Sequence, residues 1–444
     1  MTGTATRTGR DGRIVELGLR QNWRQFTLLV VVNACVGGLV GLERTTVPLI
    51  GSETFGLRND LAVFSFIIAF GVTKAFTNLA AGALTARLRR KTILLAGWVV
   101  GIPVPFLLAW APAWGWIIAA NVLLGLNQGL AWSMTVNMKI DLVGPRNRGL
   151  ATGLNEAAGY GAVGATALLT GYLATSYGLR PTPQLIGVVF VVAGLGLSLI
   201  TRDTADHVAL ELDLERQRQR GQVRTATTGD TPAADAADDD GPQDTGLRAT
   251  FWRTSWTNRS LRGSSQAGLI NNLNDGLTWG VFPLLFTYHG LGIAAVGLIK
   301  GLYPLLWGFG QIPAGHLSDR IGRKQLIVAG MFVQAAAFVL ALALLNTPLL
   351  AGLLSAAALG VGTAMVYPTL IASISDHARP AWRANALGTY RFWRDLGYAA
   401  GALVGGVVAD LSGLNAAVIA AAVITAGSGL LAARWITEPR RTDR

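Results

Sequence analysis

Residues 82 to 91 read GALTARLRRK, and the pattern returns at residues 315 to 324 as GHLSDRIGRK, an offset of 233 residues. A second group of residues returns at an offset of 235. It comprises Gly125, Asp141, Pro145, Arg148, Ala151 and Gly153, which correspond to Gly360, Asp376, Pro380, Arg383, Ala386 and Gly388. Nearly constant offsets in two separate places indicate that the chain consists of two homologous halves.

Long apolar blocks flank both copies of this pattern. Hydrophobic residues make up 51% of the 444 residues and charged residues only 14%, which is unlike a soluble domain. Each block has about 20 residues, the length of a helix that crosses roughly 30 Å of hydrocarbon. We therefore expect an all-α polytopic membrane protein, with two pseudo-symmetric six-helix bundles around a central cavity. The expected spans are 25–48, 61–83, 92–110, 115–138, 149–173, 184–200, 266–288, 293–314, 325–345, 349–372, 385–409 and 414–434.

Lys and Arg are distributed unevenly over the segments between these spans. Thirty of the 37 lie in the terminal arms, the linker and the loops of one side, whereas the opposite loops hold only Arg58 and Arg180. Because positively charged loops stay in the cytoplasm, this asymmetry predicts a multi-pass protein of the plasma membrane with both termini inside. The net charge of +12 then reflects membrane topology, and nucleic acid is not expected as a partner.

The spans divide the chain into a cytoplasmic N-terminal arm (1–24), a first bundle (25–200), a linker (201–265), a second bundle (266–436) and a cytoplasmic tail (437–444). The linker is polar and lacks the apolar periodicity of a core, so we expect it to be mostly flexible, with a short helix near 208–220. A regulatory or docking role of the linker is the alternative. The arm resembles the start of a signal peptide, but the apolar run has no small-residue cleavage pattern, which favours an uncleaved first span.

Nine charged residues lie inside the expected spans, namely Glu43, Arg44, Lys74, Glu156, Asp275, Lys300, Arg391, Arg394 and Asp395. A charge in a membrane is costly unless it faces protein or water, so each is a candidate for function. Spans three, six, nine and twelve carry no charge and are best suited to contact lipid. The five positive charges nearly cancel the four negative ones, which favours mutual ion pairs over a strongly anion-selective cavity.

Polar and aromatic residues repeat at helical spacing on the charged spans. Such stripes indicate a wet cavity shared by the two bundles, and its aromatic rings are suited to stack on an organic substrate, with core packing as the alternative. We expect the cavity to be lined by Asn33, Arg44, Lys74, Asn78, Gln128, Trp132, Asn271, Asn274, Trp279, Tyr303, Trp307, Gln311, Tyr367, Tyr390, Arg391, Arg394 and Asp395.

Three carboxylates inside the spans are candidates for proton coupling. Asp275 is the first, because it lies near the middle of its span with only amides close in sequence. Glu156 and Glu43 follow, with a salt bridge from Glu156 to Arg391 or Arg394 as the alternative. Burial and a nearby Arg act on the proton affinity of a carboxylate in opposite directions, so this affinity can change as the bundles move.

Two six-span halves, a central linker and the complete motif GHLSDRIGRK resemble the major facilitator superfamily, over nearly the whole chain outside the linker. The resemblance implies a cytoplasmic gate in which the Asp and the basic residues of the motif pair with neighbouring helix ends. We assign to this gate Asp319, Arg320, Arg323, Lys324, Arg87, Arg90, Lys91, Arg148 and Arg383. The first motif copy departs from the pattern, because Ala86 replaces its Asp and Arg89 its Gly.

These features together predict a monomeric secondary active transporter of a small organic molecule that works by alternating access, coupled to protons, with export preferred on the resemblance. A proton-coupled importer of a metabolite is the alternative, and a channel is less favoured. No metal or cofactor is expected, because the single cysteine and the four histidines form no ligand cluster inside a span. An enzyme is not expected either, since no nucleophile, base and metal constellation is present.

Overall fold

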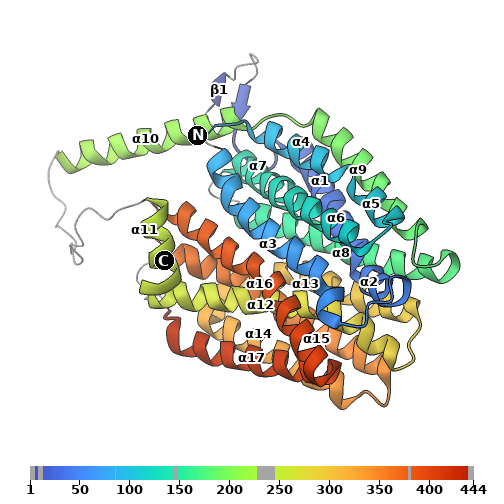
Figure 1. Ribbon diagram of the computed structural model, residues 1–444. Coiled ribbons are helices and arrows are strands. Elements are labelled where there is room, and N and C mark those ends of the chain that lie inside the picture. Colours follow the sequence, from blue (N-terminus) through green and yellow to red (C-terminus); the bar gives the residue numbers. More distant parts are fainter. Residues whose placement is uncertain are drawn as a thin grey trace.

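The computed structural model describes residues 6–8, 14–85, 87–144, 148–227, 246–378 and 382–438, and it consists almost entirely of helices. Figure 1 shows the two halves as two adjacent bundles, blue to green and yellow to red. The first bundle contains α1 (Trp23–Gly41), α2 (Glu43–Leu49), η1 (Ile50–Thr54), α3 (Asp60–Leu84), α4 (Arg90–Gly101), α5 (Val104–Trp110), α6 (Trp114–Asn127), η2 (Gln128–Trp132), α7 (Ser133–Val143), α8 (Arg148–Tyr177) and α9 (Thr182–Ile200). The second contains α12 (Arg259–Tyr288), α13 (Ile293–Ile321), α14 (Arg323–Ala343), α15 (Pro348–His377), α16 (Arg383–Ser412) and α17 (Leu414–Trp435). The predicted all-α fold of two pseudo-symmetric bundles is confirmed.

Nine helical segments of the described chain are long and apolar enough to cross a membrane. Several of them join shorter pieces, as in Trp23–Thr54, where Pro48 lies inside α2 and a π-helical turn follows. Three more helices, α8, α12 and α16, have 30 residues each. These three carry Glu156, Asp275 and the Arg391 to Asp395 stripe, which lowers their hydropathy. The expected count of twelve spans therefore stays a prediction.

The internal repeat is visible in equivalent ion pairs at one end of each bundle. Nε of Arg90, at the start of α4, lies 2.7 Å from Asp141 at the end of α7. Nε of Arg323, at the start of α14, lies 3.2 Å from Asp376 at the end of α15. We call this end of the molecule, with the loops 85–89 and 322, the motif end, and the end with the loops 55–59 and 289–292 the far end. Each pair ties two helices of one bundle together.

Two helix crossings join the bundles, α3 with α16 and, at the equivalent place in the repeat, α8 with α13. A Cβ atom added at Gly164 would lie 2.6 Å from the carbonyl oxygen of Gly301, and one at Gly71 would lie 2.6 Å from the backbone nitrogen of Ala399. Neither distance leaves room for a methyl group, so backbone meets backbone at both crossings.

The helices predicted to contact lipid carry exposed apolar side chains. In α9, Val189 and Val192 are 65% and 66% exposed, and in α17 Val423 is 65% exposed. In a membrane these faces would meet acyl chains, which explains why hydrophobic side chains lie at the surface.

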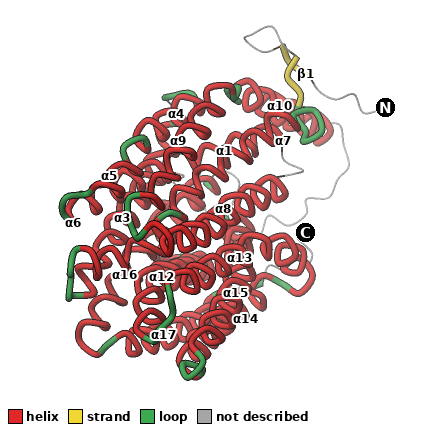
Figure 2. Tube along the Cα trace, turned by 90° about the vertical axis from the view of Figure 1, so that its right-hand side faces the viewer, coloured by secondary structure: helices red, strands yellow, loops and turns green. Residues whose placement is uncertain are grey.

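The segments outside the bundles are more ordered than the sequence indicated. The arm forms a small antiparallel ribbon of β1 (Thr6–Thr8) and β2 (Ile14–Glu16). In the linker, α10 (Ala205–Thr227) extends beyond the expected 208–220 and projects from the helical body in Figure 1. Figure 2 shows α10 at the same end of the molecule as the strand ribbon. Helix α10 is followed by α11 (Leu247–Trp252) and η4 (Arg253–Thr257). Residues 228–245 of the linker, which we expected to be mostly flexible over 201–265, lie outside the described residues.

Candidate functional site

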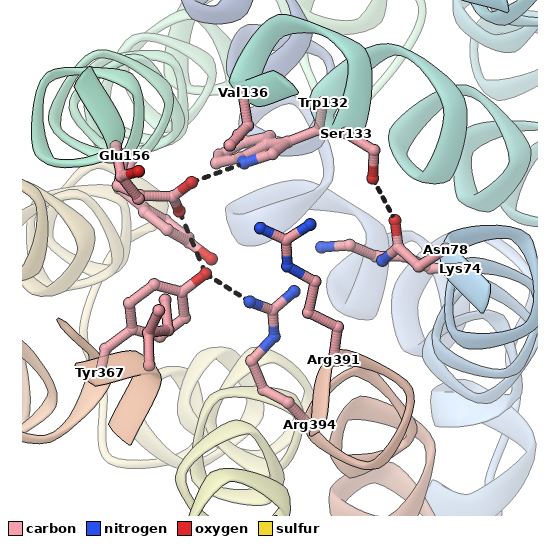
Figure 3. A pocket seen from close by; sticks show the side chains of 12 residues that line it. Lys74, Asn78, Trp132, Ser133, Val136, Glu156, Tyr367, Arg391 and Arg394 are labelled. Carbon is pink, nitrogen blue, oxygen red and sulfur yellow. Dashed lines mark hydrogen bonds between the residues drawn. The ribbon is translucent and has the colours of Figure 1, made fainter. Parts of the chain in front are cut away.

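A pocket lies between the bundles, in the half nearer the motif end. The pocket is narrow in this conformation, and the figure of about 430 Å³ for the unfilled space around it includes open solvent. Seven of the residues predicted to serve the site line it: Lys74, Asn78, Trp132, Glu156, Tyr367, Arg391 and Arg394. They come from α3, η2 and α8 of the first bundle and from α15 and α16 of the second, so both halves contribute to one site (Figure 3).

A hydrogen-bonded chain crosses this pocket from one bundle to the other. Nη1 of Arg394 donates to the Tyr367 hydroxyl at 2.6 Å, and that hydroxyl donates to Oε2 of Glu156 at 3.1 Å. The indole of Trp132 and the amide of Asn155 each donate to Oε1 of Glu156 at 3.0 Å. The carboxylate is therefore held by three donors, and it reaches Arg394 through Tyr367 instead of by the direct salt bridge expected as an alternative.

The other buried charges differ in whether they have a partner of opposite charge. Arg44 and Asp275 form a two-point ion pair, in which one nitrogen lies 3.0 Å from its oxygen. Arg394 and Asp395 form another, with Nη2 2.7 Å from Oδ1. Lys300 donates to a backbone carbonyl 2.9 Å away. These five residues are each at most 7% exposed, so their charges lie inside the protein.

Two cations that line the pocket have no direct partner among the described residues. Within the described part of the chain, neither Lys74 nor Arg391 has an ion pair or a hydrogen bond. The Lys74 ammonium lies over the rings of Phe70 at 5.5 Å and Tyr398 at 5.1 Å. The Arg391 guanidinium extends into the middle of the pocket, as Figure 3 shows. Three cations (Lys74, Arg391 and Arg394) and two carboxylates (Glu156 and Asp395) thus gather at the pocket, and of these cations only Arg394 has a direct ion pair among the described residues.

The space between this pocket and the far end is closed by side chains from both bundles. The Arg44–Asp275 pair joins α2 to α12, and the Arg44 guanidinium lies 4.2 Å from the ring centroid of Trp279. Phe66 and Phe70 of α3 pack edge-on against the same indole, with centroids 5.5 and 5.3 Å away. An ion pair and an aromatic cluster thus seal the bundles together here.

Nearer the far end, α16 also caps α3. Oδ1 of Asp410 accepts from the backbone N–H of Asp60 at 2.6 Å, and Oδ2 accepts from that of Leu61 at 3.1 Å. These two N–H groups have no partner inside their own helix, and their dipoles favour a carboxylate. The contact exists only while the far ends of the bundles are together.

We expect Asp410→Ala to weaken this closure by about 1 kcal/mol, which is roughly a fivefold rise in the ratio of open to closed far ends. Distances between spin labels at Arg58 and Ser412 would measure the two populations. Asp410→Asn, which keeps an acceptor oxygen, should change the ratio less. Identical distance distributions for wild type and Asp410→Ala would show that the cap does not contribute to closure.

Glu43 is a buried acid whose carboxylate has neither an ion pair nor a hydrogen bond among the described residues. It is 0% exposed, and among the described residues neither carboxylate oxygen has a hydrogen-bond partner. The Asn121 side chain faces it, but the Asn121 amide donates to the carbonyl of Ile117 at 3.0 Å. Glu43 precedes the Arg44 of the far-end ion pair, and its own carbonyl accepts from the Trp279 indole at 3.2 Å.

Other residues assigned to the cavity do not line this pocket. Asn33 and Gln128 donate to backbone carbonyls within the first bundle at 2.7 and 2.8 Å, and Asn274 donates to Gln334 within the second at 2.9 Å. The pocket lining likewise excludes Arg44, Asn271, Trp279, Tyr303, Trp307, Gln311, Tyr390 and Asp395. The reason is that a polar stripe on a helix can face a neighbouring helix as well as a cavity, and these side chains are buried between helices.

Five lining residues were not predicted: Ser133, Val136, Thr152, Tyr160 and Ile371. Tyr160 is the most informative of them, because its ring stacks on Trp307 with centroids 3.5 Å apart. It lies in a glycine- and alanine-rich stretch that indicates close packing. Tyr160 follows Glu156 by four residues and therefore shares its helix face, which is the sequence feature that could have identified it as a lining residue.

The residues assigned to the gate contact helix ends of their own bundle. Besides the two ion pairs described above, the backbone N–H of Lys91 donates to Asp203 at 3.1 Å, and that of Lys324 donates to Glu438 at 2.5 Å. These contacts are again equivalent in the two halves. They hold the motif loops in place, and each of these four contacts lies within one bundle.

The remaining gate residues are Arg87 and Arg320, which are exposed, and Arg383, which donates to the carbonyl of Ala378 at 3.1 Å. Ala86 and the side chains of Arg148 and Asp319 lie outside the described part of the structure. The gate therefore stays a prediction.

The sequence pattern of the Major Facilitator Superfamily matches residues 28–259 and 266–444 of this chain. A 160-residue stretch is 33% identical to the inner membrane transport protein YajR of Escherichia coli (strain K12). That match covers 35% of this chain and 34% of YajR, so the aligned part spans about a third of the relative's length.

Two solved structures have the same fold. One is a POT family transporter in complex with a thioalcohol-conjugated peptide, with a TM-score of 0.67, 13% identity, and coverage of 92% of this chain and 95% of the other. The second is a bacterial homologue of the human lysosomal transporter Spinster in an inward-facing, unoccupied conformation, with a TM-score of 0.62, 15% identity, and coverage of 93% and 98%.

Proposed function

The chain belongs to the Major Facilitator Superfamily, whose members are transporters and not enzymes, and we propose that it moves a small organic molecule across a membrane by alternating access. The observation that carries this proposal is a pocket lined by both bundles whose far side is sealed by contacts between those bundles. Such contacts exist in only one arrangement of the halves, so breaking them opens the pocket to the other side.

We further propose coupling to protons, with Glu43 as the residue that carries the proton in this conformation. Of the three predicted carboxylates, Asp275 is held by Arg44, and Glu156 by three donors. The Glu43 carboxylate has neither an ion pair nor a hydrogen-bond donor among the described residues. An ionised carboxylate without such a partner is strongly disfavoured in a buried site, which favours the protonated form. When the far end opens, water reaches Glu43 and the Arg44–Asp275 pair separates, so either acid can exchange a proton there.

The orientation follows from the distribution of positive charge. The motif end carries most of the Lys and Arg outside the helices, which supports a cytoplasmic location for that end and for both termini, in the plasma membrane. Export is preferred to import on the superfamily resemblance, and no residue distinguishes the two directions. A channel is less favoured, because contacts between the described residues of the two bundles close the far side of the pocket.

Reconstitution into proteoliposomes tests these proposals. Uptake of a panel of organic acids, amines and neutral compounds under an imposed pH gradient should be saturable and gradient-driven for at least one class. Uptake that rises linearly with concentration would favour a channel, and movement of no compound would contradict transport.

Glu43→Gln tests the proton site in the same vesicles. The variant should keep exchange of a transported compound at equal pH, because the amide preserves the shape of the side chain. It should lose accumulation driven by the pH gradient. Accumulation equal to that of wild type would show that Glu43 does not carry the coupled proton.

A further inference from the structure

The arrangement of acidic and basic side chains around the pocket indicates the charge of its ligand. Asp395 uses one oxygen for Arg394, with Nε 2.8 Å away, and the other for the amide of Asn78. Glu156 is occupied by its three donors. The acids near the pocket thus have other hydrogen-bond partners, and they act on Lys74 and Arg391 only through space, without a direct ion pair to either cation among the described residues.

Keeping two such cations in a mostly buried site is unfavourable unless something compensates for the lost water. The rings of Phe70 and Tyr398 compensate Lys74 in part. Arg391 has no ring contact or ion pair among the described residues. An anion between the two heads would accept charge-assisted hydrogen bonds from both of them, since ammonium and guanidinium groups are donors only.

The rest of the lining is suited to a flat apolar body. Trp132, Tyr160 and Tyr367 line the pocket with aromatic rings, of which Tyr160 and Tyr367 are only 4% and 2% exposed in this conformation, and Val136 and Ile371 add aliphatic side chains. The Trp132 and Tyr160 rings lie 5.2 Å apart, centroid to centroid, and Trp132 also lies 5.7 Å from the Lys74 ammonium. A ring placed on this surface would bring its acidic substituent within reach of Lys74.

We propose that the pocket binds a planar organic anion, with its acidic group between Lys74 and Arg391 and its ring against Trp132 and Tyr160. This inference rests on the proposed transport function, since it names the substrate class of the same pocket. It also differs from the expectation drawn from the nearly equal numbers of positive and negative charges. The sum of the charges is nearly zero, but Asp275 neutralises Arg44, which does not line the pocket, while Arg391 has no such partner among the described residues.

Binding to the purified full-length protein in detergent tests the charge requirement. The probes are 2-naphthoate, 2-naphthamide and 2-naphthylmethylamine, which share one ring system and differ in charge. We expect 2-naphthoate to bind at least tenfold more tightly than the other two. Equal or tighter binding of the amide or the amine, or no binding of 2-naphthoate to the folded protein, would overturn the proposal.

Variants test the assigned residues. Arg391→Gln and Lys74→Gln should each weaken 2-naphthoate binding about tenfold or more, with little effect on the amide. Arg391→Lys, which keeps the charge, should recover part of the affinity. The matched control is Arg58→Gln, which removes one positive charge from an exposed far-end loop and should leave binding unchanged. Wild-type affinity for 2-naphthoate in both Gln variants would overturn the assignment.

Transport of the same probes separates this inference from the proposed function. Gradient-driven uptake of the amine or the amide without that of 2-naphthoate would leave the transporter in place and refute the anion site. Tight, charge-dependent binding of 2-naphthoate, with no probe or panel compound ever moved across the vesicle membrane, would support the anion site and contradict transport.

Discussion

Asp275→Ala is expected to destabilise the protein by about 3–5 kcal/mol, the cost of leaving one partner of a buried ion pair without the other. Asp275 and Arg44 are 0% and 3% exposed, so water cannot replace the lost carboxylate. Lys300, also buried, adds a second positive charge to the same region, with its Nζ bonded to the carbonyl of Thr278. The unfolding free energy, measured by denaturation in mixed micelles, should show the loss.

A double variant distinguishes a charge effect from a simple packing defect. Arg44→Met with Asp275→Leu replaces the pair by apolar groups of similar size, and such replacements are often neutral. We expect the double variant to be more stable than either single variant. If its destabilisation equals the sum of the two single losses, the two side chains act independently and the pair does not hold the far end closed.

Tyr367→Phe is expected to weaken the contact between the bundles in the half nearer the motif end. The hydroxyl accepts from Arg394 and donates to Glu156, and a buried hydrogen bond to a charged group contributes about 1.5–3 kcal/mol. The ratio of separated to closed motif ends should therefore rise roughly tenfold to a hundredfold. Distances between spin labels at Leu88 and Gln325, both exposed at that end, would measure the ratio.

Two controls accompany this measurement. Glu156→Gln keeps an oxygen that accepts from Tyr367 but loses the charge, so its effect should be smaller than that of Tyr367→Phe. Tyr177→Phe removes the hydroxyl of an exposed tyrosine at the end of α8 and should leave the distances unchanged. An unchanged distribution for Tyr367→Phe would mean that the chain from Arg394 to Glu156 does not join the bundles.

The sequence predicts the bundles and part of the pocket, because both depend on local periodicity. Apolar blocks of the right length and the repeated motif establish the two halves without any knowledge of contacts. The stripe containing Arg391 and Arg394 also identifies one pocket wall correctly, since residues three apart on a helix face the same way. These features need only the geometry of one helix.

Partners that are distant in the chain could not be predicted in the same way. Asp275 has only amides near it in sequence, and its counter-ion, Arg44, lies 231 residues away. Asn33 and Gln128 have the spacing of cavity residues, yet they bond to neighbouring helices of their own bundle. Helical spacing shows that side chains share a face, but not which neighbour that face meets.

The two glycine crossings also determine how the bundles can move. Gly164 meets Gly301 on one side of the pocket, and Gly71 meets Ala399 on the other, both at backbone distance. Two points of close approach define an axis, and a rotation about it displaces atoms in proportion to their distance from it. The residues at the crossings would therefore move little, while the loops at the two ends of the molecule would move in opposite directions. A bulkier residue at either point would shift this axis without touching the ligand.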